Sequence, residues 1–97
     1  AHLGEAFGID VEVHACGPAH RHVMGAMRNS NFYEVALVGP DCPNAVPPVY
    51  ACGYSDLLES IEPDGCVLVP DGPGLGVIYD WEFINANTTN VTVFNNC

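Results

Sequence analysis

The sequence predicts an α/β fold in which a strand–helix–strand unit is followed by a segment of irregular structure. Two apolar runs, at 9–14 and 32–38, flank a stretch whose apolar residues recur at helical spacing. A strand, a helix and a strand within about 30 residues have the size of a parallel βαβ unit. From residue 39 the composition changes, because four prolines within nine residues favour an extended connection over a helix. We therefore divide the chain into residues 1–38 and residues 39–97.

The composition describes one small domain with enough apolar residues for a packed core, since 48% of the 97 residues are hydrophobic. No run approaches the roughly 18 apolar residues of a membrane span, so we expect no membrane partner. Twelve Asp and Glu face two Arg and no Lys, and a net charge of -10 argues against binding nucleic acid through its phosphates. Five cysteines without a CxxC pair indicate reduced thiols in a cytoplasmic protein, although N-x-Thr sequons begin at Asn87 and Asn90.

The first residues predict the end of a helix. Leu3 and Phe7 lie four residues apart on one helical face, and Gly8 stands where a glycine commonly follows a helix. No capping residue and no first turn precede this pattern, so we expect the chain to be cut from a longer protein. The apolar, β-branched run at 9–14 then predicts the first strand.

A helix is predicted after the break at Gly17 and Pro18, because proline suits the first helical turn. Arg28 is placed in its last turn, and its apolar stripe consists of Ala19, Val23, Ala26 and Met27. The second strand is predicted over 32–38. Strands joined in this way are parallel and buried on both faces, so the unit needs neighbouring strands. These come from the rest of its own fold or from other chains, and we expect a homo-oligomer.

Within 39–97 the sequence predicts short elements only. A short helix is expected at 56–60, strands at 66–69 and 75–79, turns at 70–74 and a helical turn at 81–84. The glycine-rich stretch 71–76 lacks the Gly-Lys-Ser/Thr ending and the following helix of a phosphate-binding loop. Turn chemistry is therefore the interpretation of these glycines.

His14 and Glu34 are the two candidate site residues. His14 ends the first strand, and parallel α/β folds gather function at the carboxyl ends of strands, where a histidine can move a proton near neutral pH. The alternative is a capping histidine that bonds a loop carbonyl. Glu34 interrupts an otherwise apolar strand, so it is either a polar group aimed at a substrate or a solvated rim residue. The residues alone leave both pairs of alternatives open.

The other histidines give a weaker pattern. His20 and His22 are two residues apart on a helix and face different directions, so they cannot chelate one ion together. A zinc site that combines one of them with His14 and Cys16 matches no established spacing. We therefore predict no metal ligands within these 97 residues.

Three segments, in this order, resemble one family. The run VEVH at 11–14, followed by Gly-Pro and a helix and then by NFYE at 31–34, resembles strands seven and eight of mandelate racemase-like members of the enolase superfamily. VPDGPGLGV at 69–77 resembles the segment that follows the barrel in these enzymes. The resemblance covers about residues 1–84. It implies the C-terminal βαβ portion of a (β/α)-barrel, followed by an irregular segment that packs on the barrel and on a capping domain.

The resemblance also implies a chemistry. Such enzymes bind a carboxylate substrate on Mg²⁺ and remove the proton α to the carboxylate, while the metal stabilises the enolate. His14 matches the seventh-strand histidine that acts as general base or acid. Glu34 matches the glutamate at the catalytic end of the eighth strand, which hydrogen-bonds the substrate carboxylate, and this shortens the second strand that we predict. The Mg²⁺ ligands and the aspartate that orients the histidine belong to strands outside this chain.

Three functions follow as hypotheses. The leading one is the C-terminal portion of a Mg²⁺-dependent acid-sugar dehydratase, in which His14 takes the α-proton and then assists departure of the β-hydroxyl. The alternative is a racemase or epimerase of a 2-hydroxy acid, in which His14 works opposite a lysine that must come from outside this lysine-free chain. The third is a non-catalytic fragment that self-associates through its βαβ faces. In each case the 97-residue chain is expected to be inactive by itself.

Overall fold

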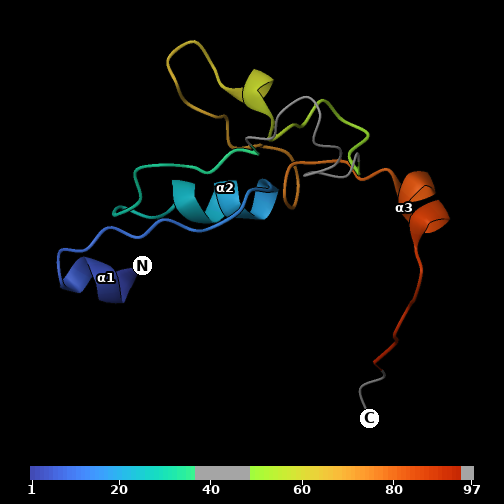
Figure 1. Ribbon diagram of the computed structural model, residues 1–97, viewed down its shortest axis with the longest axis horizontal. Helices are drawn as coiled ribbons and strands as arrows, with labels where there is room; N and C mark the ends of the chain where they lie inside the picture. Colours follow the sequence, from blue (N-terminus) through green and yellow to red (C-terminus); the bar gives the residue numbers. More distant parts are fainter. Residues whose placement is uncertain (37–48, 95–97) are drawn as a thin grey trace.

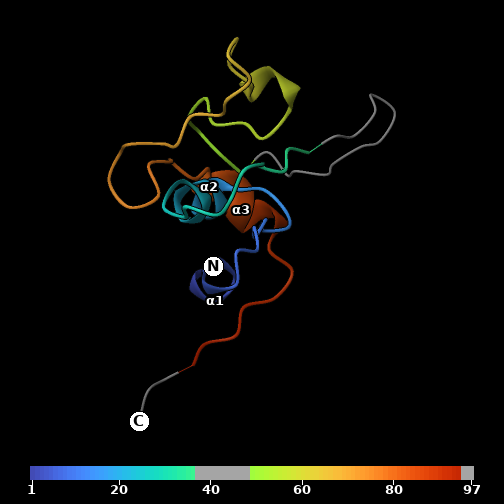
Figure 2. The same ribbon diagram turned by 90° about the vertical axis from the view of Figure 1, so that its left-hand side faces the viewer.

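The computed structural model describes residues 1–36 and 49–94, and these residues form short helices joined by extended and turn segments. Figure 1 shows the helices in chain order, which are α1 (His2–Ala6), α2 (Pro18–Gly25), the 3-10 helix η1 (Leu58–Ser60) and α3 (Trp81–Asn87). Figures 1 and 2 both show the chain after α3 leaving the rest of the molecule as an exposed tail. None of the helices in the described ranges is long and apolar enough to cross a membrane.

The predicted helix at the start of the chain is present as α1 and ends as expected. Gly8 has a φ angle of 67°, a left-handed conformation that glycine adopts without a steric penalty. Its amide donates to the carbonyl of Glu5, and the Ile9 amide donates to the carbonyl of Gly4. These two bonds satisfy carbonyls that the end of the helix leaves without partners.

The predicted second helix is also present, but it is shorter and buries a different face. Pro18 occupies its first turn as predicted, whereas the helix ends at Gly25, so Arg28 lies beyond its last turn. Arg28 forms an ion pair with Glu5 of α1 instead. The buried residues of α2 are Pro18, Arg21 and Met24. Of the apolar stripe that predicted the helix, Ala19 and Val23 are exposed on α2, whereas Ala26 and Met27 follow its last residue and Met27 is half-buried.

The segments predicted as strands of the βαβ unit run extended but form no ladder within the described residues. They lie side by side at one end, where the Val11 amide donates to the carbonyl of Asn29 over 2.7 Å. Glu12 adds a side-chain link, since its carboxylate accepts from the amides of Asn31 and Phe32 at 3.0 and 3.1 Å. Two strands without neighbours do not form a stable sheet. The α/β barrel fold therefore remains a prediction, and residues 37–48, including the proline-rich connection, lie outside the described residues.

The second half contains the predicted elements in reduced form. The predicted helix at 56–60 is the single turn η1, and the strands predicted at 66–69 and 75–79 are each represented by one antiparallel bridge, Ile61 to Val67 and Tyr50 to Tyr79. The turns at 70–76 require a glycine at position 76, where φ is 69° and a Cβ atom would lie 2.5 Å from Pro70 Cβ. The helical turn predicted at 81–84 extends to Asn87 as α3, and the Asp80 carboxylate caps it by accepting from the Phe83 amide.

The interior of the described residues is polar. Met24 is the buried hydrophobic residue, whereas Arg21 and Asp56 are only 5% and 1% exposed. Arg21 donates to Asp56 Oδ1 from both Nε and Nη2, at 3.2 and 2.9 Å. The hydroxyl groups of Tyr33 and Tyr54 donate hydrogen bonds to the same carboxylate oxygen, and their rings lie against the Arg21 guanidinium. We call these four residues the Arg21 cluster, and it connects α2 to segments before and after the undescribed residues.

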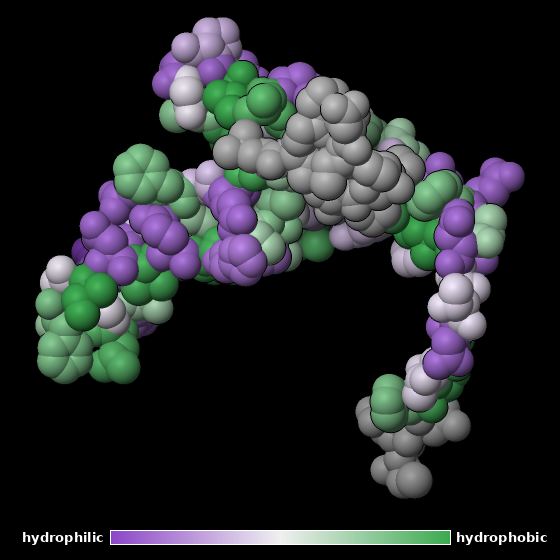
Figure 3. Space-filling view, viewed as in Figure 1, coloured by the Kyte–Doolittle hydropathy of each residue, from purple (hydrophilic) through white to green (hydrophobic). Residues whose placement is uncertain are grey.

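Large hydrophobic side chains remain on the surface, as the space-filling view shows over α1 and beside η1 (Figure 3). The exposed ones include Leu3, Phe7, Ile9, Val23, Phe32, Leu57, Leu58, Ile61, Leu68, Val69, Leu75, Ile78, Trp81, Val91, Val93 and Phe94. The accessible surface of the chain is 7492 Å², whereas a globular protein of this length exposes about 5,400 Å². Buried polar contacts rather than a hydrophobic core therefore hold the described segments together.

Replacing Asp56 by alanine should destabilise the chain severely, because it leaves the Arg21 guanidinium buried without a counter-charge. We expect a loss of about 3–5 kcal/mol in the free energy of unfolding, measured by urea titration with circular dichroism. The matched control is Glu5→Ala, which removes the partner of the exposed Arg28 and should cost less than about 1 kcal/mol. Equal losses in the two variants would contradict a stabilising role for the buried pair.

Candidate active site

The structure brings the two predicted site residues together. His14 Nδ1 and Glu34 Oε2 are 2.8 Å apart, although 20 positions separate the two residues in the sequence. Both side chains line an open cavity of about 320 Å³ together with Glu12, Val13, Phe32 and Tyr33. The ends of the two extended segments therefore meet at this pair.

The backbone conformation after His14 directs the Ala15 amide toward Glu34. Ala15 has a φ angle of 75°, the left-handed conformation that is sterically unfavourable for a residue with a Cβ atom. In this conformation the Ala15 amide donates to Glu34 Oε2 over 2.5 Å. One carboxylate oxygen thus receives a backbone amide and the imidazole at the same time. A strained alanine that serves one carboxylate indicates that the surrounding contacts fix the local geometry.

The electrostatics of the pair favour an ionised carboxylate. The hydrogen bond from the Ala15 amide, followed by the attraction of His14, holds the pKa of Glu34 below its ordinary value. An ionised Glu34 accepts a hydrogen bond from Nδ1–H of His14 and so selects the tautomer in which Nε2 carries the lone pair. The His14 side chain is 92% exposed, so its ring is open to a molecule in the cavity. Such a histidine can accept a proton at Nε2.

The contact of Glu34 differs from the one that the resemblance implies. In the family pattern an aspartate from another strand orients the histidine, and the glutamate bonds the substrate carboxylate. Here Glu34 occupies the orienting position at Nδ1 of His14. With 47% of its side chain exposed, Glu34 also remains accessible from the cavity. The sequence pattern therefore identified the two residues, and the structure gives their mutual contact.

Of the other candidates, His22 makes a structural contact, and Cys16 is a poor nucleophile. Nε2 of His22 lies 3.2 Å from the carbonyl oxygen of Leu75 and links α2 to the glycine-rich turns. Burial, followed by the charge of Asp56, raises the pKa of the Cys16 thiol, which disfavours the nucleophilic thiolate. Within residues 1–36 and 49–94 no three His, Cys, Asp or Glu side chains converge as metal ligands. The described residues therefore do not fit a Mg²⁺ site, and the expectation that its ligands lie outside this chain stays a prediction.

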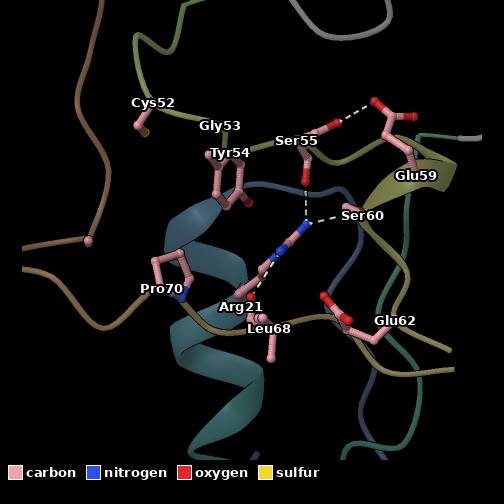
Figure 4. Close-up of a pocket in the computed structure, with 11 residues that line it drawn as sticks. Arg21, Cys52, Gly53, Tyr54, Ser55, Glu59, Ser60, Glu62, Leu68 and Pro70 are labelled. Atoms are coloured by element: carbon pink, nitrogen blue, oxygen red, sulfur yellow. Dashed lines mark hydrogen bonds between the residues drawn. The ribbon is translucent and has the colours of Figure 1, made fainter. Parts of the chain in front are cut away.

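Sequence reasoning missed the Arg21 cluster, to which Tyr33, the residue before Glu34, belongs. Figure 4 shows Arg21 reaching from α2 into an open cavity of about 370 Å³, toward Ser55 and Ser60. Its Nη2 donates to the Ser55 carbonyl at 2.5 Å, and its Nη1 donates to the Leu68 carbonyl at 2.9 Å. Because Nε, Nη1 and Nη2 all donate within the chain, the guanidinium stabilises the structure rather than binding a ligand. The one feature of the sequence that could have indicated this cluster is an arginine within a predicted helix, in a chain with only two arginines and no lysine.

Comparison with known proteins identified no relative: no family model, no curated protein and no solved structure matches this chain.

The pKa of Glu34 should lie below its ordinary value of 4.5 in the folded chain. Since folding lowers this pKa, ionised Glu34 stabilises the fold above pH 4.5, and this stabilisation is lost as the pH falls through the lowered value. Carbon-13 NMR of the Glu34 side chain gives the titration directly. In His14→Gln the pKa should remain below 4.5, because the Ala15 amide is the largest cause of the shift. A return to the ordinary value in that variant would show that the imidazole, not the amide, holds the carboxylate ionised.

Proposed function

We propose that the chain is the C-terminal βαβ portion of an enolase-superfamily barrel enzyme, and that His14 transfers the proton α to a substrate carboxylate. The observation that supports this proposal most directly is the contact of 2.8 Å between His14 Nδ1 and Glu34 Oε2. The residues come from the two segments that resemble strands seven and eight of such barrels. The open cavity beside them has room for a small carboxylate.

In this proposal Glu34 prepares His14 for both halves of the reaction. While the imidazole is neutral, the carboxylate keeps the proton on Nδ1, and Nε2 is the base. Once Nε2 has taken the α-proton, the negative charge of Glu34 stabilises the imidazolium. The protonated ring can then return the proton to a leaving hydroxyl. A single histidine can thus act as base and then as acid in a dehydration. Dehydration of an acid sugar is therefore the reaction that we prefer.

Mg²⁺, held by carboxylates outside this chain, would supply Lewis-acid stabilisation of the negative charge that develops on the substrate carboxylate. A racemase or epimerase of a 2-hydroxy acid remains the alternative, and it requires a second base on the opposite face of the substrate. The chain contains no lysine, so that base would also come from elsewhere.

We further propose a cytoplasmic location. Cys16, Cys52 and Cys66 carry free thiols, which fits a reducing compartment. Cys42 and Cys97 lie outside the described residues.

The function is tested in a polypeptide that carries these residues within a complete barrel. His14→Asn should slow Mg²⁺-dependent exchange of the α-proton of aldonic or aldaric acids with deuterated water by about 10²–10⁴-fold. The exchange is measured by proton NMR, and dehydration is followed as release of the 2-keto product. The matched control is His2→Asn on α1, an exposed histidine that does not line the His14–Glu34 cavity and should leave both rates unchanged. Full exchange in His14→Asn would refute the proposal.

Self-association is the second candidate function, and the exposed hydrophobic side chains favour it. In that case the 97-residue chain should sediment as a dimer or larger species at micromolar concentration. Association should strengthen with added salt, because screening weakens the repulsion between chains of charge -10. Val23→Asp on the uncovered face of α2 should weaken it, whereas Val91→Asp in the exposed tail should not. A monomer at every concentration and salt level would exclude this candidate.

A further inference from the structure

We infer that Tyr33 is a positioning residue for the His14–Glu34 pair, because its hydroxyl ties the loop after His14 to the buried carboxylate of Asp56. This inference rests on the proposed function of the pair. Tyr33 directly precedes Glu34, and its hydroxyl and ring contact Asp56 and Arg21 of the Arg21 cluster. It therefore connects the stable interior to the exposed site.

The hydroxyl of Tyr33 makes contacts on both sides of this connection. It accepts a hydrogen bond from the Gly17 amide at 2.8 Å and donates to Asp56 Oδ1 at 2.5 Å. The Gly17 carbonyl oxygen lies farther away, at 3.3 Å. A phenol has one proton, and the shorter, charge-assisted bond to the carboxylate takes it. Burial, followed by the hydrogen bond to Asp56, raises the pKa of Tyr33, so the hydroxyl stays protonated and keeps this arrangement.

Holding Gly17 also holds Ala15. The two residues belong to the short loop between His14 and α2, and Ala15 adopts its left-handed conformation there. The amide of Ala15 then reaches Glu34 Oε2. Without an anchor at Gly17, the alanine can relax to a more favourable conformation, and its amide turns away from Glu34.

Glu34 itself is anchored on both sides to the same residue. On one side Tyr33 bonds the carboxylate of Asp56, and on the other the Ala36 amide donates to the Asp56 carbonyl oxygen at 2.8 Å. The segment 33–36 is therefore fixed against Asp56, which the ion pair with Arg21 keeps buried. Both partners of the candidate site, the His14 loop and the Glu34 segment, depend on this one acid.

Tyr54 provides a matched control. Its hydroxyl also donates to Asp56 Oδ1, at 2.9 Å, and its ring also lies against the Arg21 guanidinium. The hydroxyl contact that distinguishes the two tyrosines is the one between Tyr33 and Gly17. Tyr33→Phe and Tyr54→Phe thus each remove one hydrogen bond from the same carboxylate, but only the first releases the loop.

The experiment compares the two variants in the full chain by carbon-13 NMR of glutamate side chains. Tyr33→Phe should raise the pKa of Glu34 toward its ordinary value, because the Ala15 amide no longer donates to it, whereas Tyr54→Phe should leave this pKa unchanged. In the complete barrel, Tyr33→Phe should lower kcat by about 10- to 100-fold with little change in KM, since the pair is misplaced rather than removed. Equal effects of the two variants on the Glu34 titration would overturn the inference.

A measurement on the unmodified chain covers the case in which Tyr33→Phe does not fold. The Gly17 amide should be protected from hydrogen exchange by its bond to Tyr33. Exchange at the rate of an unstructured peptide would overturn the inference. The outcome is separate from that of the proposed function. If His14→Asn leaves catalysis intact while Tyr33→Phe still shifts the Glu34 titration, Tyr33 positions the pair and the assigned chemistry is wrong.

Discussion

The ion pair between Arg21 and Asp56 is the contact on which the described structure depends. Arg21 belongs to α2, whereas its partners at Ser55, Asp56 and Leu68 come from segments far along the chain. Two charges buried in this way cost solvation free energy, and the cost is offset when every donor finds an acceptor. The described residues contain no buried side-chain nitrogen or oxygen without a hydrogen bond. With Met24 as the buried hydrophobic residue, this satisfied polar network takes the place that an apolar core has in most domains.

The candidate site inherits its geometry from this network. His14 and Glu34 are themselves exposed, and an exposed ion pair contributes little to stability. Tyr33 connects the buried cluster to the loop after His14 by accepting a hydrogen bond from the Gly17 amide, two residues after the strained Ala15. A site of this kind combines an open, accessible histidine with a rigid support. For the proposed proton transfer that combination is favourable, because a base must meet its substrate at a fixed distance.

The exposed apolar residues favour association with another molecule, whereas the net charge of -10 opposes association between copies of this chain. Val23 on α2 and the residues around η1 offer apolar contacts. Of the two cations of the chain, Arg21 is buried against Asp56 and Arg28 is paired with Glu5, so the acidic surface has few opposite charges of its own. A second copy of this chain would meet that surface with more negative charge, so association between copies depends on how far salt screens the repulsion.

The sequence by itself determined the local features. Helix spacing and the positions of Gly8 and Pro18 predicted α1 and α2, because these signals depend on neighbours in the chain alone. The family pattern selected His14 and Glu34, and the two residues do lie in contact. Which face of α2 is buried was decided by tertiary structure, because Arg21 finds its counter-charge 35 residues away, at a distance that no local pattern encodes. The roles of Asp56 and Tyr33 emerged for the same reason: a buried charge is stabilised only by partners that the folded chain brings to it.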